Sequence, residues 1–203
     1  MTRIAVLGWG SLIWDLGVLA PKTAGGWAMR GGPALPMEFS RISPKRRMGL
    51  VVCLDPEHGV ACATHAIRST RVEIEAAVED LAEREIAPVE RIGFTFRGTS
   101  HGRLSAVAQA VADWCASEGW DGAVWTDLEP NYEEHRGERF SVPGAMGYLR
   151  TLRGASLSEA HRYIEEAPET TRTPLRVALE RDAWWTGLRG TLTPPEDIVE
   201  GGG

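Results

Sequence analysis

The chain has 203 residues, of which 43% are hydrophobic and 25% charged, a composition typical of one or two globular domains. Its 28 acidic residues outnumber the 22 basic ones, and a net charge of −6 without a run of five like charges argues against nucleic-acid or anionic-membrane partners. Glycine and polar residues break up the N-terminal segment, which is therefore unlike a signal peptide or a membrane span. Three cysteines without CxxC or Cys/His spacing favour a reducing, cytoplasmic location.

The first third of the chain is expected to form four strands. Residues 3–8 and 48–54 are short apolar runs typical of buried strands. Residues 34–43 alternate apolar and polar side chains, which predicts a strand with one buried and one solvated face. An Asp-Pro turn at 55–59 leads into a strand at 60–67, so we expect a hairpin between the last two strands.

Helices are expected to follow. Residues 71–86 contain no Gly or Pro, and Thr70 with Glu73 forms a capping box, which predicts a helix. The pattern then predicts a strand, a helix ending at a glycine and a further strand, at 91–97, 104–119 and 121–128. Three more helices are expected in the last third, over 142–154, from Ser156, and from Thr173 to Trp185.

Strands come first in this order and most helices last. The order predicts an α+β fold with a small mixed sheet or barrel, because regular βαβ winding would alternate the two. We expect one domain over residues 1–190, with a helical C-terminal region, and a loose tail over 191–203.

The loop GWGSLIW (8–14) follows the first expected strand, and two glycines flank Trp9 in it. Such a loop can turn backbone N–H groups inward and form a nest for a carboxylate or an oxyanion. It is neither a P-loop nor a dinucleotide fingerprint, since no Lys follows at the required spacing and Ile13 stands where a glycine is needed. A tight turn capped by Ser11 is the alternative. Trp9 and Trp14 are candidates for the wall of a pocket.

Glu85 is the one acidic residue of the expected helix 71–86 that falls on its apolar stripe. At about 100° per residue, Val78, Leu81 and Glu85 all lie within about 40° of Ile74. Burial and the negative end of the helix dipole both disfavour a charged carboxylate, which suits general acid–base catalysis near neutral pH. The alternative is a frayed last turn in which Glu85 is solvated or paired with a nearby arginine, Arg84 or Arg91.

Other candidates are weaker. The five histidines show no i, i+4 pair and no HExxH pattern, so we expect no metal site. The polar stretch 130–140 follows the last expected strand, where Asn131 and Tyr132 are placed to contact a ligand; a solvated connection is the alternative.

Five segments resemble, in order, the pattern of the ChaC-type γ-glutamyl cyclotransferases. VLGWGSLIWD (6–15) is similar to the F-G-Y-G-S-L-I-W signature of that family. FSRIS (39–43) resembles its Y-S-R-R strand, and LVVCLDPEHGV (50–60) its strand, Asp-Pro turn and strand. LAEREIAPVER (81–91) resembles the L-x-x-R-E-x-x-G-Y-R segment that carries the catalytic glutamate, and EPNY (129–132) the N-P-x-Y loop.

The resemblance implies a fold, a reaction and a set of site residues. The fold would be the γ-glutamyl cyclotransferase-like one, a small mixed β-barrel with surrounding helices. The reaction would cleave a γ-glutamyl amide or peptide to 5-oxoproline and a free amine or amino acid, with Glu85 as general acid/base and without metal or cofactor. Arg41 and Tyr132 are further candidates for substrate binding, Arg41 with a surface ion pair as its alternative. The substrate-binding loop would comprise Gly8, Trp9, Gly10, Ser11, Leu12 and Ile13.

Several positions depart from the family pattern, namely Trp9, Ala61, Cys62, His65, Pro88 and Val89. Because of these departures, the sequence does not define which amine is the leaving group. It does not define the oligomeric state either. They also motivate an alternative from another class, a non-catalytic domain of the same fold that binds a small amino-acid-like ligand and regulates another process. A γ-glutamyl amidase or transferase is the third interpretation.

Overall fold

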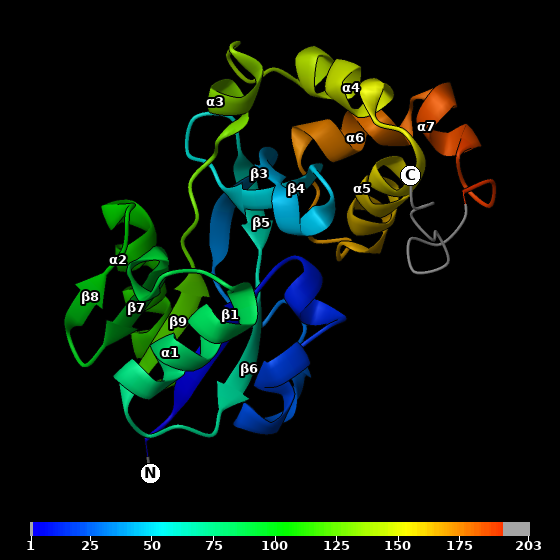
Figure 1. Cartoon of the computed structure of the whole chain (residues 1–203). Coiled ribbons are helices and arrows are strands. Elements are labelled where there is room, and N and C mark those ends of the chain that lie inside the picture. The colour runs from blue at the N-terminus through cyan, green and yellow to red at the C-terminus, as the bar shows by residue number, and fades with distance from the viewer. Residues whose placement is uncertain (1, 193–203) are drawn as a thin grey trace. The chain divides into compact units, whose positions relative to one another are not determined.

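The computed structural model describes residues 2–192 (Figure 1). The chain divides into two compact units. Within the described residues, unit 1 comprises 2–35, Ala61–Leu128 and Pro168–Thr171, and unit 2 comprises Pro36–Val60, Glu129–Ala167 and 172–192. The expected single domain over 1–190 stays a prediction. The expected tail over 191–203 lies, from residue 193 on, outside the described residues.

Unit 1 is built on a six-stranded mixed sheet with the order β2-β6-β1-β9-β7-β8. The central strand β1 pairs antiparallel with β6 and parallel with β9. The strands are β1 Ile4–Gly8, β2 Thr23–Ala28, β6 His65–Ser69, β7 Ile92–Phe96, β8 Thr99–His101 and β9 Gly122–Thr126. Its helices are α1 Ile74–Glu85 and α2 Ser105–Glu118, with short 3-10 turns η1 Ser11–Ile13, η2 Gly17–Lys22 and η4 Val89–Arg91.

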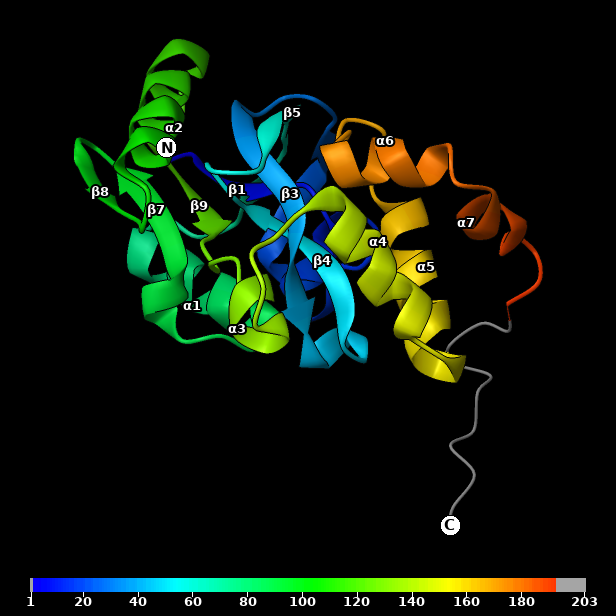
Figure 2. The same cartoon turned by 90° about the horizontal axis from the view of Figure 1, so that it is seen from above.

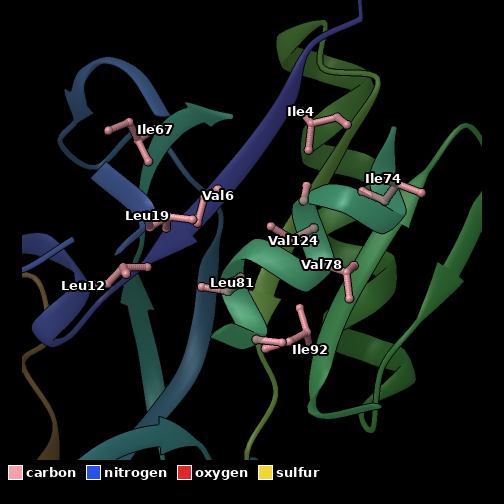
Figure 3. Close-up of a cluster of buried hydrophobic side chains, with 12 residues drawn as sticks. Ile4, Val6, Leu12, Leu19, Ile67, Ile74, Val78, Leu81, Ile92 and Val124 are labelled. Carbon is pink, nitrogen blue, oxygen red and sulfur yellow. The ribbon is translucent and has the colours of Figure 1, made fainter. Parts of the chain in front are cut away.

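Helix α1 covers one face of this sheet, and the apolar stripe expected from the sequence is the contact. Ile74, Val78 and Leu81 are buried against side chains of β1, β6, β7 and β9 (Figure 3). Figure 2 shows α2 on the opposite side of β7 and β9 from α1. The periodicity of α1 therefore predicted its buried face correctly, and that face orients the end of the helix, where Glu85 lies.

Unit 2 combines a strand pair with the C-terminal helices. Strands β3 Ala34–Ser43 and β4 Gly49–Leu54 pair antiparallel around the turn η3 Pro44–Arg46, in a second sheet of order β4-β3-β5. Three of the four residues of β5 Val60–Ala63 fall within the segments of unit 1. Helix α5 packs on β4. The helices are α3 Tyr132–Arg136, α4 Val142–Thr151, α5 Gly154–Glu166, α6 Pro174–Glu180 and α7 Ala183–Gly187.

The α+β class is confirmed, but the closed barrel is wrong for the described residues. The six-stranded sheet is open and ends at β2 and β8. Neither edge strand has a fully buried face, since β8 is exposed throughout and β2 is exposed or half-buried. Strands β3 and β4 pair with each other in the second sheet and so do not extend the first.

The expected cap of α1 and the expected hairpin are both wrong, because the residues involved have other partners. Thr70 does not cap α1: its hydroxyl and its N–H both donate to the carbonyl of Lys22, and the helix begins at Ile74. The stretch 60–67 is two strands rather than one, and the expected hairpin with 48–54 is absent from the described residues, because β4 pairs with β3 and β6 with β1 and β2.

Helix ends were predicted with mixed success. Gly119 ends α2 in the left-handed conformation, and Thr173 caps α6 by accepting a hydrogen bond from the N–H of Arg176, both as expected. Gly154 does not end the helix before it, because α4 stops at Thr151 and Gly154 begins α5. Among residues 2–192, no helix combines the length and the apolar character needed to cross a membrane.

Candidate functional site

The candidate site is centred on the loop that leaves β1. Strands β1 and β9 are parallel, so their carboxyl ends lie at one edge of the sheet, where open sheets commonly bind ligands. Gly8 ends β1 and must lack a side chain, because a Cβ there would lie 2.7 Å from Cη2 of Trp27. Ser11 then begins the turn η1, which the N–H of Ile13 closes on the carbonyl of Gly10 at 3.0 Å.

Glu85 is the last residue of α1. The buried stripe of the helix carries its side chain to the edge of the core, where it is 17% exposed. One carboxylate oxygen, Oε1, lies 3.4 Å from Nη1 of Arg84. The other, Oε2, has no hydrogen-bond partner in the part of the chain that the structure describes. The carboxylate is therefore half-buried, charge-paired on one side and open on the other.

Arg84 connects Glu85 to the glycine loop. Its guanidinium donates to the carbonyl of Asp15 through Nε at 3.1 Å and Nη2 at 2.6 Å, and Nη2 also donates to Oγ of Ser11 at 3.4 Å. The side chain is only 4% exposed, so these bonds are shielded from water. Arg84 thus brings together the two sequence candidates, Glu85 and the loop around Ser11, which lie more than 70 residues apart.

Sequence reasoning had considered Arg84 only as a possible partner for Glu85. The signal that could have found its structural role is its place on the flank of the apolar stripe. An arginine at that position must lie at the edge of the core, and its five donors then require acceptors from a neighbouring segment.

Arg41 and Tyr132 lie in unit 2 and bond within it. Nη1 of Arg41 donates to the carbonyl of Glu129 at 2.5 Å. Tyr132 is 1% exposed, and its hydroxyl donates to Oε1 of Glu138 at 3.1 Å. Burial raises the pKa of Tyr132. Asn131 exchanges two hydrogen bonds with the backbone of Ile42. These contacts order the stretch after β9, and substrate binding by Arg41 and Tyr132 stays a prediction.

Two threonines of a distant segment, which sequence reasoning missed, contact Trp9 of the loop and His65 of β6. The hydroxyl of Thr171, which is fully buried, donates to the carbonyl of Trp9 at 2.7 Å. Its neighbour Thr170 lies 2.9 Å from Nε2 of His65, whose Nδ1 accepts the N–H of Arg30 at 2.8 Å. Burial lowers the pKa of His65, which favours the neutral ring. No periodicity or motif in the sequence points to these threonines.

Asp127 is a third residue that was missed. It follows β9 and is 3% exposed. Its Oδ2 accepts the N–H of Arg103, whereas its buried Oδ1 has no partner among the described residues. Burial raises the pKa of this carboxyl. An acid directly after an apolar strand was the available signal, and its bond to Arg103 orders the loop that leads into α2.

Other chemistries find little support in these residues. Within residues 2–192, no group of three or more His, Cys, Asp or Glu side chains could hold a metal ion. The three cysteines are buried, and burial raises the pKa of Cys53 and Cys115 to about 12, far from that of a reactive thiolate. No protein family, curated protein or solved structure matches the chain.

Proposed function

We propose that the protein is a γ-glutamyl cyclotransferase-like enzyme that converts a γ-glutamyl amide or peptide to 5-oxoproline and a free amine or amino acid, with Glu85 as general acid/base. The observation that supports this proposal is the link through Arg84. It holds a half-buried carboxylate with an open oxygen beside a glycine loop at the carboxyl end of β1. Such a carboxylate is suited to acid–base catalysis, and such a loop is suited to binding an anionic substrate.

The reaction is intramolecular. The α-amine nitrogen of the substrate attacks its own γ-carbonyl carbon, a ring C–N bond forms, and the bond from that carbon to the leaving nitrogen breaks. Oε2 of Glu85 accepts the proton that the α-ammonium group loses and donates a proton to the departing amine. Because nucleophile and electrophile belong to one molecule, the protein has to fold the substrate and to stabilise charge.

The loop would supply the charge stabilisation. Backbone N–H groups of Gly10, Ser11 and Leu12 would hold the α-carboxylate of the substrate or the developing oxyanion. Arg84 would act as a positioning residue, because its bonds to the carbonyl of Asp15 fix the loop while Nη1 orients Oε1 of Glu85. Oε2 would then exchange the proton with the substrate, while Oε1 faces Nη1 of Arg84 at 3.4 Å.

Glu85→Gln tests the proposal, with Glu79→Gln as its matched control on the exposed side of the same helix. Purified proteins are incubated with γ-glutamyl dipeptides and γ-glutamylamines, and 5-oxoproline is measured by mass spectrometry. We expect Glu85→Gln to lower kcat about 10²-fold or more, since the amide cannot accept the proton, and Glu79→Gln to match the wild type. Full activity in Glu85→Gln would remove Glu85 from the mechanism.

The same incubations separate the other interpretations. Free glutamate or a new γ-glutamyl conjugate, in place of 5-oxoproline, would identify an amidase or a transferase. A wild-type protein that releases none of these products, but whose Tm rises with an amino-acid-like ligand, would be the non-catalytic binding domain.

A further inference from the structure

The residue after Glu85 has an unusual conformation. Ile86 caps α1 with φ +52° and ψ +48°, in the left-handed region. Its N–H and that of Ala87 donate to the carbonyls of Glu83 and Ala82, the pattern of a Schellman cap. Glycine or asparagine suits this position, whereas a β-branched side chain there is strained. Only backbone groups make these bonds, so they do not require isoleucine.

Packing within the chain does not offset the strain at Ile86. Its side chain is 79% exposed, the highest value among the large hydrophobic residues that the structure describes. A glycine would keep both hydrogen bonds and remove the exposed apolar surface. The isoleucine at this position is therefore unexplained by the fold, and its position directly after Glu85 suggests that its contact is made with a ligand.

Two further exposed apolar side chains lie in the same corner of unit 1. Of the seven large hydrophobic residues exposed in the described part of the chain, three flank the Arg84–Glu85 pair, namely Val18, Ile86 and Val89. Val18 follows Gly17, where a Cβ would lie 3.5 Å from Cδ of Arg84. Val89 begins η4, which packs against α1. We call these three residues the apolar rim.

The charges around the apolar rim disfavour an anion. The side chain of Glu83 is 58% exposed, and Glu90 is also exposed. Of the described cations in this corner, Arg84 bonds to the carbonyl of Asp15 and Lys22 pairs with Asp80 and Glu83 at 3.0 and 2.5 Å, while Arg91 ends η4. An amino acid or a dipeptide as leaving group would bring its own carboxylate close to Glu83 and Glu90, which repel it.

We infer that the apolar rim binds the leaving group of the substrate, and that this group is an amine whose substituent is a hydrocarbon without a carboxylate. The inference rests on the proposed function and narrows its substrate class to γ-glutamyl amides of apolar amines. Glu85 would protonate the departing nitrogen, while Ile86, the next residue, would contact the hydrocarbon attached to it. The strain at Ile86 would then be retained for substrate selection.

The experiment compares two substrates, γ-glutamyl-isoamylamide and γ-glutamylglycine, which differ in the size and charge of the leaving group. For the wild type we expect kcat/KM to be at least about tenfold higher for the isoamylamide. Ile86→Gly should reduce this ratio about tenfold and raise Tm by about 2–4 °C, because the strained side chain is removed. Ile86→Asn, which also suits left-handed backbone, should reduce the ratio likewise.

Val72→Ala is the matched control, since Val72 is 50% exposed just before the other end of α1 and should leave both values unchanged. A wild type that prefers γ-glutamylglycine, or a ratio that neither Ile86 variant changes, would overturn the inference and leave the proposed function intact. A wild type that releases 5-oxoproline from neither these two compounds nor the larger set would overturn both.

Discussion

Two glutamates, one in each unit, show how differently this fold treats an acid inside a core and one at its edge. Glu38 on β3 of unit 2 is fully buried, and its oxygens accept the N–H groups of Phe39 at 2.7 Å and of Leu175 at 3.1 Å. Glu85 of unit 1 is half-buried and has one long contact, with Arg84. A carboxylate whose oxygens are bound internally is a structural element, whereas one with an open oxygen is suited to chemistry. The two glutamates therefore differ both in burial and in the number of carboxylate oxygens that have a partner.

Removing each carboxylate in a separate variant should give the largest difference in the free energy of unfolding. Glu38→Ala leaves two buried N–H groups without an acceptor, and we expect it to lower the free energy of unfolding by about 3 kcal/mol. Glu85→Ala should lower it by about 0.5 kcal/mol or less, because only a partly exposed ion pair is lost. Urea unfolding of both variants measures the difference. Equal losses would mean that Glu85 is structural as well.

Arg84 should have an intermediate effect. Arg84→Met keeps the length of the side chain but removes the hydrogen bonds to the carbonyl of Asp15, and we expect a loss of about 2 kcal/mol in urea unfolding. The turnover assay should also report a lower kcat, since the loop and Glu85 are no longer held together. Arg97→Met is the control, because Arg97 is 62% exposed and pairs with Asp121 only at 3.7 Å. An Arg84→Met protein as stable as this control would contradict the assigned role.

The same contrast explains what the sequence could predict. Strands β1, β3, β4, β7 and β9 and the buried stripe of α1 follow from local patterns, because apolar residues at strand or helix spacing must face a core. On β3, however, Glu38 and Ser40 occupy the positions that alternation assigns to water, and both are fully buried. Their partners are Leu175 and Asp55, which are distant in sequence, and no local pattern reports them.

Only part of the candidate site could likewise be predicted from the sequence. Helical periodicity placed Glu85 at the edge of the core, and the two glycines marked the loop after β1. The bonds that connect them could not be predicted, because they depend on which carbonyl the guanidinium of Arg84 reaches in the folded chain. Thr171 is a more extreme case, since its bond to the carbonyl of Trp9 joins residues 162 positions apart.

His65 extends the comparison to a buried titratable group in unit 1, whose effect on stability should depend on pH. Its Nδ1 accepts the N–H of Arg30, and burial lowers its pKa. In the unfolded chain a histidine binds a proton below about pH 6.5, whereas His65 in the folded chain stays neutral to lower pH. Its contribution is therefore complete above pH 6.5 and decreases as the pH falls below that value.

We expect the urea midpoint to decrease between pH 7.5 and 5.5, and to decrease less in His65→Gln, which has no group that titrates there. His161 in unit 2, whose pKa burial also lowers, contributes to the same decrease and should account for the part that remains in His65→Gln. The control His135→Gln, at an exposed position in α3, should follow the wild type. If His65→Gln shows the full wild-type decrease, His65 titrates alike in both states, and its hydrogen bond to Arg30 cannot hold the ring neutral.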